Sequence, residues 1–415
     1  MSLVFDFNLD DRYHFRPTLE VPARQFFDWD SIPEEQLQAL AFQIGMTELV
    51  SYWKIACPKR VVVKPYALTE SQKAFWKKLY YNGLGEFLYL NSIAVSEAEL
   101  MAIETLPIDS MPSHILPGND MGSWFEEKTL VPIGGGKDSV VTLECLRNVM
   151  SVTPLIVNPR GATLNCVKTA GYKDDEFIVI NRTLDPTMLK LNAEGYLNGH
   201  TPFSALLAFI SLLVAFGSRS KYIALSNENS ANESTVPGTN INHQYSKSIE
   251  FESDFRNYVA ENLSEEVQYF SFLRPLSELQ IAKLFSQCEA YHPVFRSCNV
   301  GSKTDSWCGH CPKCLFTWII LSPFLSREKL VSIFGKDLMA DRSLQPILEE
   351  LNGTAAVKPF ECVGTVEEVN ACLAATTKAP EPVEGPTVEA ILSRFNTNHF
   401  LPEKFEQILK SRLHV

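Results

Sequence analysis

The sequence of 415 residues has no excess of positive charge, no long hydrophobic run and no N-terminal targeting pattern. Its net charge is -12, whereas proteins that bind duplex nucleic acid usually carry a basic face, so we expect no nucleic acid partner. The longest apolar stretch, residues 203–217, is too short to span a bilayer. Residues 1–11 lack a basic segment followed by an apolar one, so we expect no signal peptide. These absences favour a cytoplasmic protein that does not enter the membrane.

The apolar stretch is flanked by residues that are typical of helix boundaries. Thr201 and Pro202 precede it, as an N-cap residue and a first-turn proline would, and Gly217 closes it. Glycine is common just after the last helical residue because it adopts the left-handed backbone conformation without strain. The sequence therefore predicts a buried helix over residues 202–216 that ends at Gly217.

The ten cysteines fall into two groups. Six are scattered, mostly in apolar surroundings, and are predicted to be reduced and buried: Cys57, Cys145, Cys166, Cys288, Cys362 and Cys372. The other four form the pattern C-x9-C-x2-C-x2-C: Cys298, Cys308, Cys311 and Cys314. In a cytosolic chain of this size such a cluster indicates metal rather than disulfides. Four sulfur ligands favour a structural zinc ion without an open position, while an iron–sulfur cluster and free thiols remain as alternatives. His310, between two of these cysteines, is expected to face outward.

Short β-rich runs alternate with helical segments from about residue 129. Predicted strands cover residues 130–133, 155–157, 177–180, 222–225 and 267–272. Predicted helices cover residues 34–56, 70–81, 138–150, 315–325, 344–351, 388–395 and 402–413, and a further strand covers 60–63. The alternation predicts an α/β fold with a parallel sheet, helices on both faces and a ligand site beyond the carboxyl ends of the strands.

Three regions are expected along the chain. Residues 1–125 are predicted to form an N-terminal domain whose role the sequence does not indicate, and residues 126–325 a central α/β domain that includes the four-cysteine motif. Residues 326–415 are predicted to be a helical C-terminal region, interrupted by a proline-rich acidic linker at 379–386.

A glycine-rich loop follows the strand predicted at 130–133 and opens the next helix. It consists of Gly134, Gly135, Gly136, Lys137, Asp138 and Ser139. Unpaired backbone N–H groups and the helix dipole suit such a loop to phosphate, and glycines allow close approach. It is not a Walker A loop, because Val131 stands where the first glycine belongs and Asp138 follows Lys137. It is not Gly-x-Gly-x-x-Gly either, because Ser139 replaces the last glycine; an ordinary glycine turn is the alternative.

The loop resembles the pyrophosphate loop, Ser-Gly-Gly-x-Asp-Ser, of the N-type ATP pyrophosphatases. This resemblance implies a PP-loop domain, similar to the adenine nucleotide alpha hydrolases, whose loop holds the β- and γ-phosphates of ATP. It also implies transfer of AMP to a substrate oxygen with release of diphosphate. Gly134 stands where the family usually has serine, which removes one hydroxyl donor and leaves the backbone cradle.

A polar segment follows the strand predicted at 222–225. It begins with Ser226, Asn227 and Glu228, and a second polar run covers residues 242–248. Substrate groups are expected at this carboxyl edge of the sheet, although a solvated loop is the alternative.

Combined motifs resemble two families of adenylating enzymes. The glycine loop with the late cysteine motif resembles the 7-cyano-7-deazaguanine synthases, which implies a carboxylate-adenylating ligase that forms an amide or a nitrile. Residues 198–202, 226–228, 242–248 and the cysteine segment together are similar to the UDP-N-acetyl-α-D-muramoyl-L-alanyl-L-glutamate epimerase (MurL) family, over most of the chain. This second resemblance implies an isomerase of peptidoglycan synthesis and cell wall biogenesis. Its substrate is the small molecule UDP-MurNAc-L-Ala-L-Glu, whose terminal L-glutamate is inverted with ATP and Mg²⁺ and with release of AMP and diphosphate.

The chemistry of such a reaction leads to hypotheses for particular residues. The loop from Gly134 to Ser139, with Ser226 and Asn227, would bind ATP, and Asp138 would lie near magnesium. Glu228 is a candidate for magnesium binding or for a base, and the candidates for proton transfer or enolate stabilisation are His243, Tyr245 and Lys247. Ordinary hydrogen-bonding or surface roles are the alternatives for these four, and a non-enzymatic nucleotide-binding module is the alternative for the whole chain.

Overall fold

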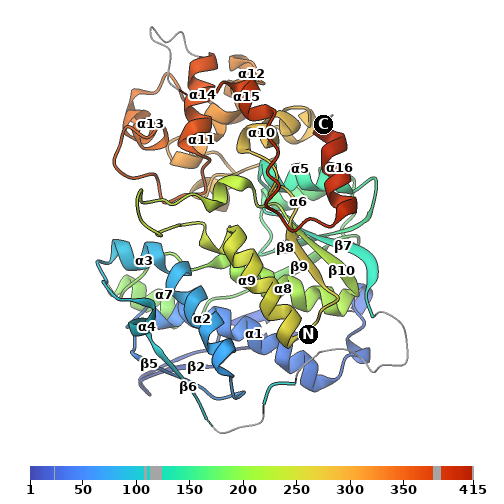
Figure 1. The fold of residues 1–415 in the computed structure, drawn as a ribbon, viewed down its shortest axis with the longest axis vertical. Helices are drawn as coiled ribbons and strands as arrows, with labels where there is room; N and C mark the ends of the chain where they lie inside the picture. Colours follow the sequence, from blue (N-terminus) through green and yellow to red (C-terminus); the bar gives the residue numbers. More distant parts are fainter. Residues whose placement is uncertain (23, 107–109, 113–123, 377–384, 414–415) are drawn as a thin grey trace. The chain divides into compact units, whose positions relative to one another are not determined.

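The computed structural model describes residues 1–22, 24–106, 110–112, 124–376 and 385–413 (Figure 1). Contacts divide the chain into two compact units, each built from separate segments. Unit 1 comprises Met1–Leu130, Ile178–Ile223 and Tyr245–Tyr269. Unit 2 comprises Val131–Phe177, Ala224–Gln244 and Phe270–Val415. The predicted three-part division of the sequence at 125/126 and 325/326 stays a prediction.

A seven-stranded sheet has the order β1-β4-β9-β8-β7-β10-β11. Its strands are β1 (Ser2–Val4), β4 (Thr18–Glu20), β7 (Glu126–Pro132), β8 (Ser151–Val157), β9 (Ile178–Arg182), β10 (Ser220–Leu225) and β11 (Gln268–Ser271). β7 and β10 pair in parallel, as predicted, and their apolar residues are buried. The N-terminal strands β1 and β4 were not predicted; β1 pairs with β4, and β4 with β9, in antiparallel fashion. The α/β class with a mainly parallel sheet is thus confirmed, whereas the PP-loop assignment stays a prediction.

Helix α8 (Phe203–Ser218) is the most deeply buried helix described in unit 1. It packs against α1 (Glu34–Trp53), while α2 (Glu70–Gly83) packs against α9 (Ile249–Asn262). The remaining elements are α3 (Gly85–Leu90), α4 (Glu97–Leu100), α7 (Pro186–Ala193), the antiparallel pair β2 (Phe7–Leu9) and β3 (Tyr13–Phe15), and the parallel pair β5 (Arg60–Val63) and β6 (Ala102–Thr105). The predicted helices at 34–56, 70–81 and 202–216 and the strand at 60–63 are confirmed, with helix ends shifted by a few residues.

The end of α8 corrects one prediction. Gly217 lies inside the helix, and the left-handed residue after it is Arg219, with a φ of 58°. A Cβ on residue 217 would lie 2.2 Å from the indole ring of Trp29. The glycine is therefore explained by close packing against an aromatic ring and not by helix termination.

Unit 1 also buries charged side chains beside β9. Arg182 Nη2 donates to Glu48 Oε2 at 2.7 Å, and both side chains are largely buried. Lys54 Nζ donates to the carbonyl of Gly199 at 2.6 Å. Burial, with a smaller contribution from Arg182, lowers the pKa of Lys54 to about 8. The segment 198–202, noted in the sequence, is thus held by a buried lysine.

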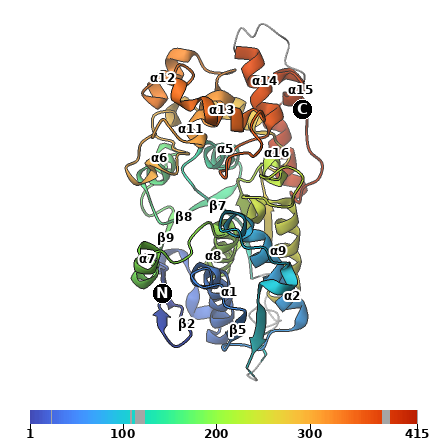
Figure 2. The same cartoon turned by 90° about the vertical axis from the view of Figure 1, so that its left-hand side faces the viewer.

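Unit 2 is mainly helical after residue 270 (Figure 2). α5 (Lys137–Leu146) contacts α10 (Glu278–Ser286) and α16 (Glu403–Leu413). α11 (Pro312–Leu321) contacts α10, α12 (Arg327–Phe334), α13 (Gln345–Leu351) and α14 (Val366–Thr376), and α15 (Val388–Leu392) contacts α10 and α14. The helical C-terminal region is thus confirmed, while most of the predicted linker at 379–386 lies outside the described residues. Within the described part of the chain, no helix combines the length and apolarity that a bilayer span requires.

Candidate functional site

The glycine loop joins β7 to α5 in unit 2 (Figure 1). Gly136 is the N-cap residue of α5, so the loop ends at the first turn of this helix, where backbone N–H groups lack helical partners. Gly135 has a φ of +81°, and a Cβ there would lie 2.9 Å from the backbone nitrogen of Thr163 in α6 (Gly161–Thr169). Glycine at 135 is therefore required both by its backbone conformation and by its neighbour. The geometry suits a phosphate group.

The cysteine segment is attached directly to this loop. The backbone N–H of Arg296 donates to the carbonyl of Gly135 at 2.8 Å. A Cβ on Gly136 would lie 2.8 Å from Ser297 Oγ. Since Cys298 follows, the cysteine motif and the glycine loop form one continuous piece of structure.

Three carboxylates gather at the start of α5. One oxygen from each of Asp138, Glu228 and Glu278 lies within 4.8 Å of the others. Lys137 Nζ, on a buried side chain, donates to Asp138 Oδ1 at 2.5 Å and also to the Glu278 carboxylate. Burial raises the pKa of Glu278. Lys137 lowers this pKa, whereas the neighbouring carboxylates raise it further. Oxygen ligands in such a group fit Mg²⁺, which would neutralise the excess negative charge.

Glu228 and Glu278 are both held by their surroundings. Ser230 Oγ donates to Glu228 Oε1 at 3.1 Å, and Arg274 Nη1 donates to the Glu228 carbonyl at 2.6 Å. Glu278 is the first residue of α10, whose start is fixed by a capping box between Ser277 and Gln280. Sequence reasoning missed Glu278, although this Ser-x-x-Gln pattern marks a helix start beside it.

The predicted nucleotide-binding residues after β10 also lie in unit 2. Asn227 is buried, and its Nδ2 donates to Ser271 Oγ at 3.0 Å. Ser226 Oγ is buried and has no hydrogen-bond partner among the described residues. The structure therefore brings the loop, Asn227 and Glu228 into one unit, with an unsatisfied hydroxyl at Ser226.

The other predicted catalytic residues lie farther along the chain. The backbone N–H of His243, in unit 2, donates to Thr235 Oγ1 at 3.0 Å. Tyr245 and Lys247 belong to unit 1, in a short 3-10 helix (Tyr245–Lys247) that packs against α2, α8 and α9. Burial and nearby carboxylates raise the pKa of Tyr245 well above its usual value. Its phenol therefore remains protonated at neutral pH and is suited to donating a hydrogen bond, not to acting as a base.

All four clustered cysteines meet in unit 2. Their sulfur atoms lie within 4.8 Å of one another, with separations of 3.7 Å for Cys298–Cys311, 3.7 Å for Cys308–Cys314 and 3.5 Å for Cys311–Cys314. In a regular tetrahedron with Zn–S bonds of about 2.3 Å, sulfur atoms are about 3.8 Å apart. The set therefore fits a single tetrahedral ion, and the identity of the metal stays a prediction.

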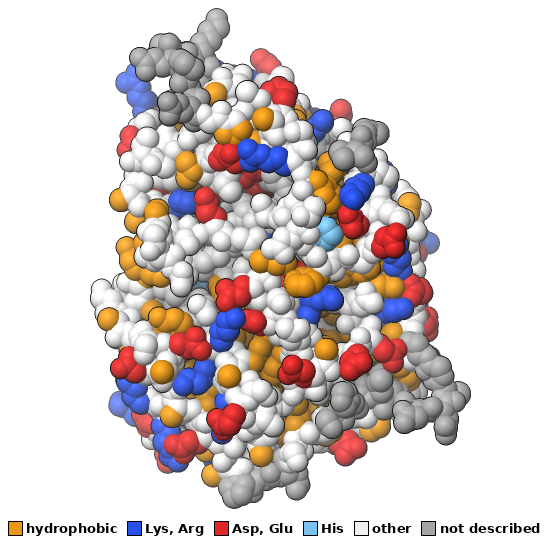
Figure 3. Space-filling model, in the orientation of Figure 1, with side chains coloured by type: hydrophobic (Ala, Val, Ile, Leu, Met, Phe, Trp, Pro, Cys, Tyr) orange, Lys and Arg blue, Asp and Glu red, His pale blue; other side chains and the backbone are white. Residues whose placement is uncertain are grey.

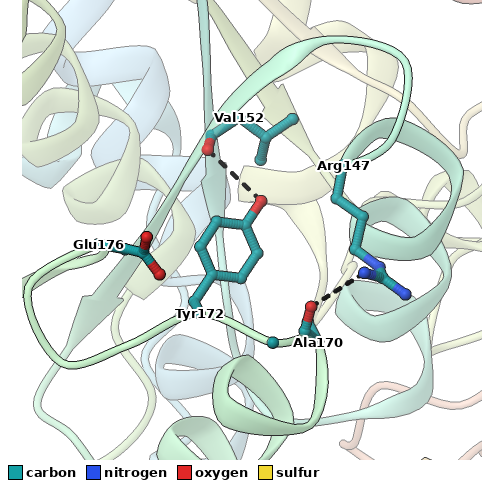
Figure 4. Close-up of a pocket in the computed structure, with 6 residues that line it drawn as sticks. Arg147, Val152, Ala170, Tyr172 and Glu176 are labelled. Carbon is teal, nitrogen blue, oxygen red and sulfur yellow. Dashed lines mark hydrogen bonds between the residues drawn. The ribbon is translucent and has the colours of Figure 1, made fainter.

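Two pockets described in unit 2 differ in their relation to the loop. The larger, of about 480 Å³, lies where α5 and α6 end; Arg147 donates there to the Ala170 carbonyl at 2.9 Å (Figure 4). It is about 15 Å along α5 from the loop, given a rise of about 1.5 Å per residue. The smaller, of about 210 Å³, is lined by Ser230, Ser277 and Glu368 among others, and so adjoins the residues that hold the carboxylate group. Acidic and basic side chains are interspersed over the face seen in Figure 3, and the absence of a nucleic acid partner stays an expectation.

Comparison with known proteins gives a consistent family assignment. A model of the MurL N-terminal domain matches residues 1–272, and one of the MurL C-terminal domain matches residues 294–404. Three similar proteins are each named UDP-N-acetyl-alpha-D-muramoyl-L-alanyl-L-glutamate epimerase. The protein from a Micromonospora species is 37% identical over 83% of this chain and 76% of its own length. The values are 36%, 83% and 74% for Salinispora tropica, and 34%, 87% and 78% for Xanthomonas oryzae pv. oryzae. No solved structure is significantly similar to the chain. The chain therefore belongs to the MurL family of epimerases, which are isomerases.

Proposed function

We propose that this protein inverts the terminal L-glutamate of UDP-MurNAc-L-Ala-L-Glu to D-glutamate, in a reaction that consumes ATP and releases AMP and diphosphate. The names of the three relatives support the substrate and the stereochemical outcome. The observation that supports the use of ATP is the gathering of Asp138, Glu228 and Glu278 at the glycine loop. Anion-binding N–H groups and cation-binding carboxylates side by side suit a nucleotide with a divalent ion.

Adenylation of the substrate would make the α-proton of glutamate easier to remove. The α-proton of glutamate is hard to remove because the adjacent carboxylate is already negative and disfavours a second charge. Converting that carboxylate to an acyl adenylate removes its charge and makes the carbonyl electron-withdrawing. A positioned base typically contributes about 10²–10⁴-fold, so activation must supply much of the remaining rate.

The candidate residues would have different roles in this reaction. The N–H groups of the loop would hold the β- and γ-phosphates, and the three carboxylates would hold Mg²⁺. The ion, when bound, neutralises charge on the phosphates. His243 and Lys247 are the candidates for moving the α-proton, and Glu228 is a third candidate in place of its role as a ligand of Mg²⁺. Tyr245, which stays protonated, is a candidate donor to the enolate oxygen. Cys298, Cys308, Cys311 and Cys314 would hold a structural zinc ion that keeps the neighbouring loop in place.

One incubation tests the proposal. The protein is mixed with ATP, Mg²⁺ and UDP-MurNAc-L-Ala-L-Glu without ammonia; the product is hydrolysed and D-glutamate is measured by chiral chromatography, with AMP and diphosphate measured in parallel. We expect all three products. D-glutamate without AMP would refute the adenylation step. AMP formation that occurs only in a parallel incubation with added ammonia would favour the ligase.

A matched pair of variants connects the reaction to the site. Asp138→Asn is expected to abolish release of diphosphate. Asp174→Asn, which changes an exposed carboxylate paired with Lys168, is expected to leave it unchanged. Full activity of Asp138→Asn would contradict the proposed role of the carboxylate group.

A further inference from the structure

The hydroxyl of Ser297 lies against the glycine loop without a partner of its own. It makes no hydrogen bond to the described part of the chain, and its side chain is half-buried. A Cβ on Gly136 would lie 2.8 Å from Ser297 Oγ, so this hydroxyl occupies the space beside the last glycine of the loop. Nothing in the described fold of unit 2 uses it.

Two attachments fix Ser297 in this position. On one side, the N–H of Arg296 donates to the Gly135 carbonyl at 2.8 Å. On the other, Cys298 belongs to the cysteine cluster, and its sulfur accepts from the N–H of Gly301 at 3.1 Å. A serine held from both sides loses little further freedom when it binds a ligand, which favours a binding role.

Other side chains at the loop are already engaged. Ser139 Oγ donates to the Gly136 carbonyl at 3.0 Å, and Lys137 is paired with two carboxylates. The guanidinium of Arg296 donates to backbone carbonyls, among them Phe295 at 2.6 Å and Pro293 at 2.9 Å. The first position of the loop, Gly134, has no side chain at all. Ser297 is thus a free hydroxyl donor beside N–H groups that suit phosphate.

We propose that Ser297 is a nucleotide-binding residue whose hydroxyl donates to a β- or γ-phosphate oxygen of ATP. The inference rests on the proposed use of ATP at this loop. It gives the cysteine segment a direct part in binding, because the residue before Cys298 contributes a ligand for the phosphate chain.

The structure provides a rescue variant. A Cβ on Gly134 would meet no atom within 4 Å, so a serine fits there. The double variant Ser297→Ala with Gly134→Ser removes the hydroxyl beside the last glycine of the loop and adds one at its first glycine. Gly136→Ala tests the idea differently, since its methyl group would displace the Ser297 hydroxyl and leave residue 297 intact.

Binding is measured by titration calorimetry with Mg²⁺–ATP and, separately, with AMP. A hydrogen bond to a charged acceptor predicts that Ser297→Ala weakens ATP binding about 10- to 100-fold. AMP binding is expected to stay the same, because AMP lacks the β- and γ-phosphates. The double variant is expected to regain most of the lost ATP affinity. Ser302→Ala, in the same segment with an exposed hydroxyl bonded to the Asn299 carbonyl, serves as the control.

The outcomes separate the inference from the proposed function. Unchanged ATP affinity in Ser297→Ala, or an equal loss for AMP, would overturn the role of Ser297 while the use of ATP stands. Absence of ATP binding by the unaltered protein would instead overturn the use of ATP. Metal content of each variant, measured by emission spectroscopy, is expected to match the unaltered protein; a loss of metal in Ser297→Ala together with unrescued binding would assign the serine to the cysteine site instead.

Discussion

Lys54 predicts an unusual dependence of stability on pH. Its pKa in the fold is about 8, against an ordinary value of 10.5, because burial disfavours the charged form. At about 1.4 kcal/mol for each tenfold change in proton affinity, keeping this side chain charged costs the folded state about 3 kcal/mol. Below pH 8 both folded and unfolded chains carry the proton, so the whole penalty is present. Between pH 8 and 10.5 only the unfolded chain carries it, so the contribution of Lys54 to stability rises with pH.

Replacing Lys54 with methionine removes the charge and keeps much of the volume. The variant escapes the penalty of about 3 kcal/mol, but it leaves the Gly199 carbonyl without its donor, at a cost of about 1–3 kcal/mol. At pH 7 we therefore expect Lys54→Met to be between about 0 and 2 kcal/mol more stable than the unaltered protein. The difference should then shift by about 2 kcal/mol in favour of the unaltered protein between pH 8 and 9.5.

Urea unfolding of both proteins at several pH values between 7 and 9.5 measures this difference. Using the difference cancels the contributions of tyrosines and cysteines that both proteins share. Lys59→Met, which changes an exposed lysine bonded to the Glu99 carbonyl, is the control and should show no such trend. A stability difference between Lys54→Met and the unaltered protein that stays constant from pH 7 to 9.5 would refute the reasoning.

Three further predictions follow from unit 1 and from the loop. Gly135→Ala is expected to abolish measurable ATP binding in calorimetry, because an alanine at this position is strained and its Cβ would meet Thr163. Gly171→Ala, also at positive φ but in open space, should bind ATP normally. Equal ATP binding by the two variants would contradict the proposal that the loop binds ATP. Glu48→Gln should lower the free energy of unfolding, measured in urea, by about 3–5 kcal/mol, because it leaves Arg182 buried without its anion. Glu104→Gln, in an exposed ion pair, should change this free energy by less than about 1 kcal/mol. Equal effects of the two variants would contradict the argument that burial makes the first pair important. For the proposed zinc site, we expect Cys311→Ser to reduce the zinc content from one ion per chain to none. The variant should also bind ATP more weakly, because the cysteine segment holds Gly135. Normal ATP affinity in a protein without metal would show that the cysteine site and the ATP site are independent.

Local patterns allowed several elements to be predicted closely. The strand at 60–63 matches β5, and the helix at 34–56 begins where α1 begins. These segments have strong periodicity or β-branched runs, which act within a few residues. Gly217 shows the limit of such signals: a glycine that closes an apolar run resembles a helix end, but its cause is Trp29, which is distant in the sequence.

Features that depend on distant partners were not predicted. The three-residue strand β4 pairs Leu19 with Arg182, and nothing in such a short segment indicates that partner. Likewise, Glu368 accepts from the N–H of Leu279 at 3.1 Å and so supports α10 from the C-terminal region. The residue types of the site were recognised where they formed a contiguous motif, as at 134–139, whereas Glu278 was missed because its role depends on Lys137.

The packing of α1 against α8 has a consequence for the newly made chain. The two helices are separated by the residues from Lys54 to Pro202, and the last segment of their unit ends at Tyr269. At about 5–20 residues per second, the ribosome adds that intervening stretch in roughly 7–30 s. During this interval α1, whose Ile44 and Val50 are buried in the fold, is synthesised and still lacks its partner α8. Unit 1 therefore depends on delayed, long-range docking, and a chaperone that shields apolar helices during synthesis would raise its yield.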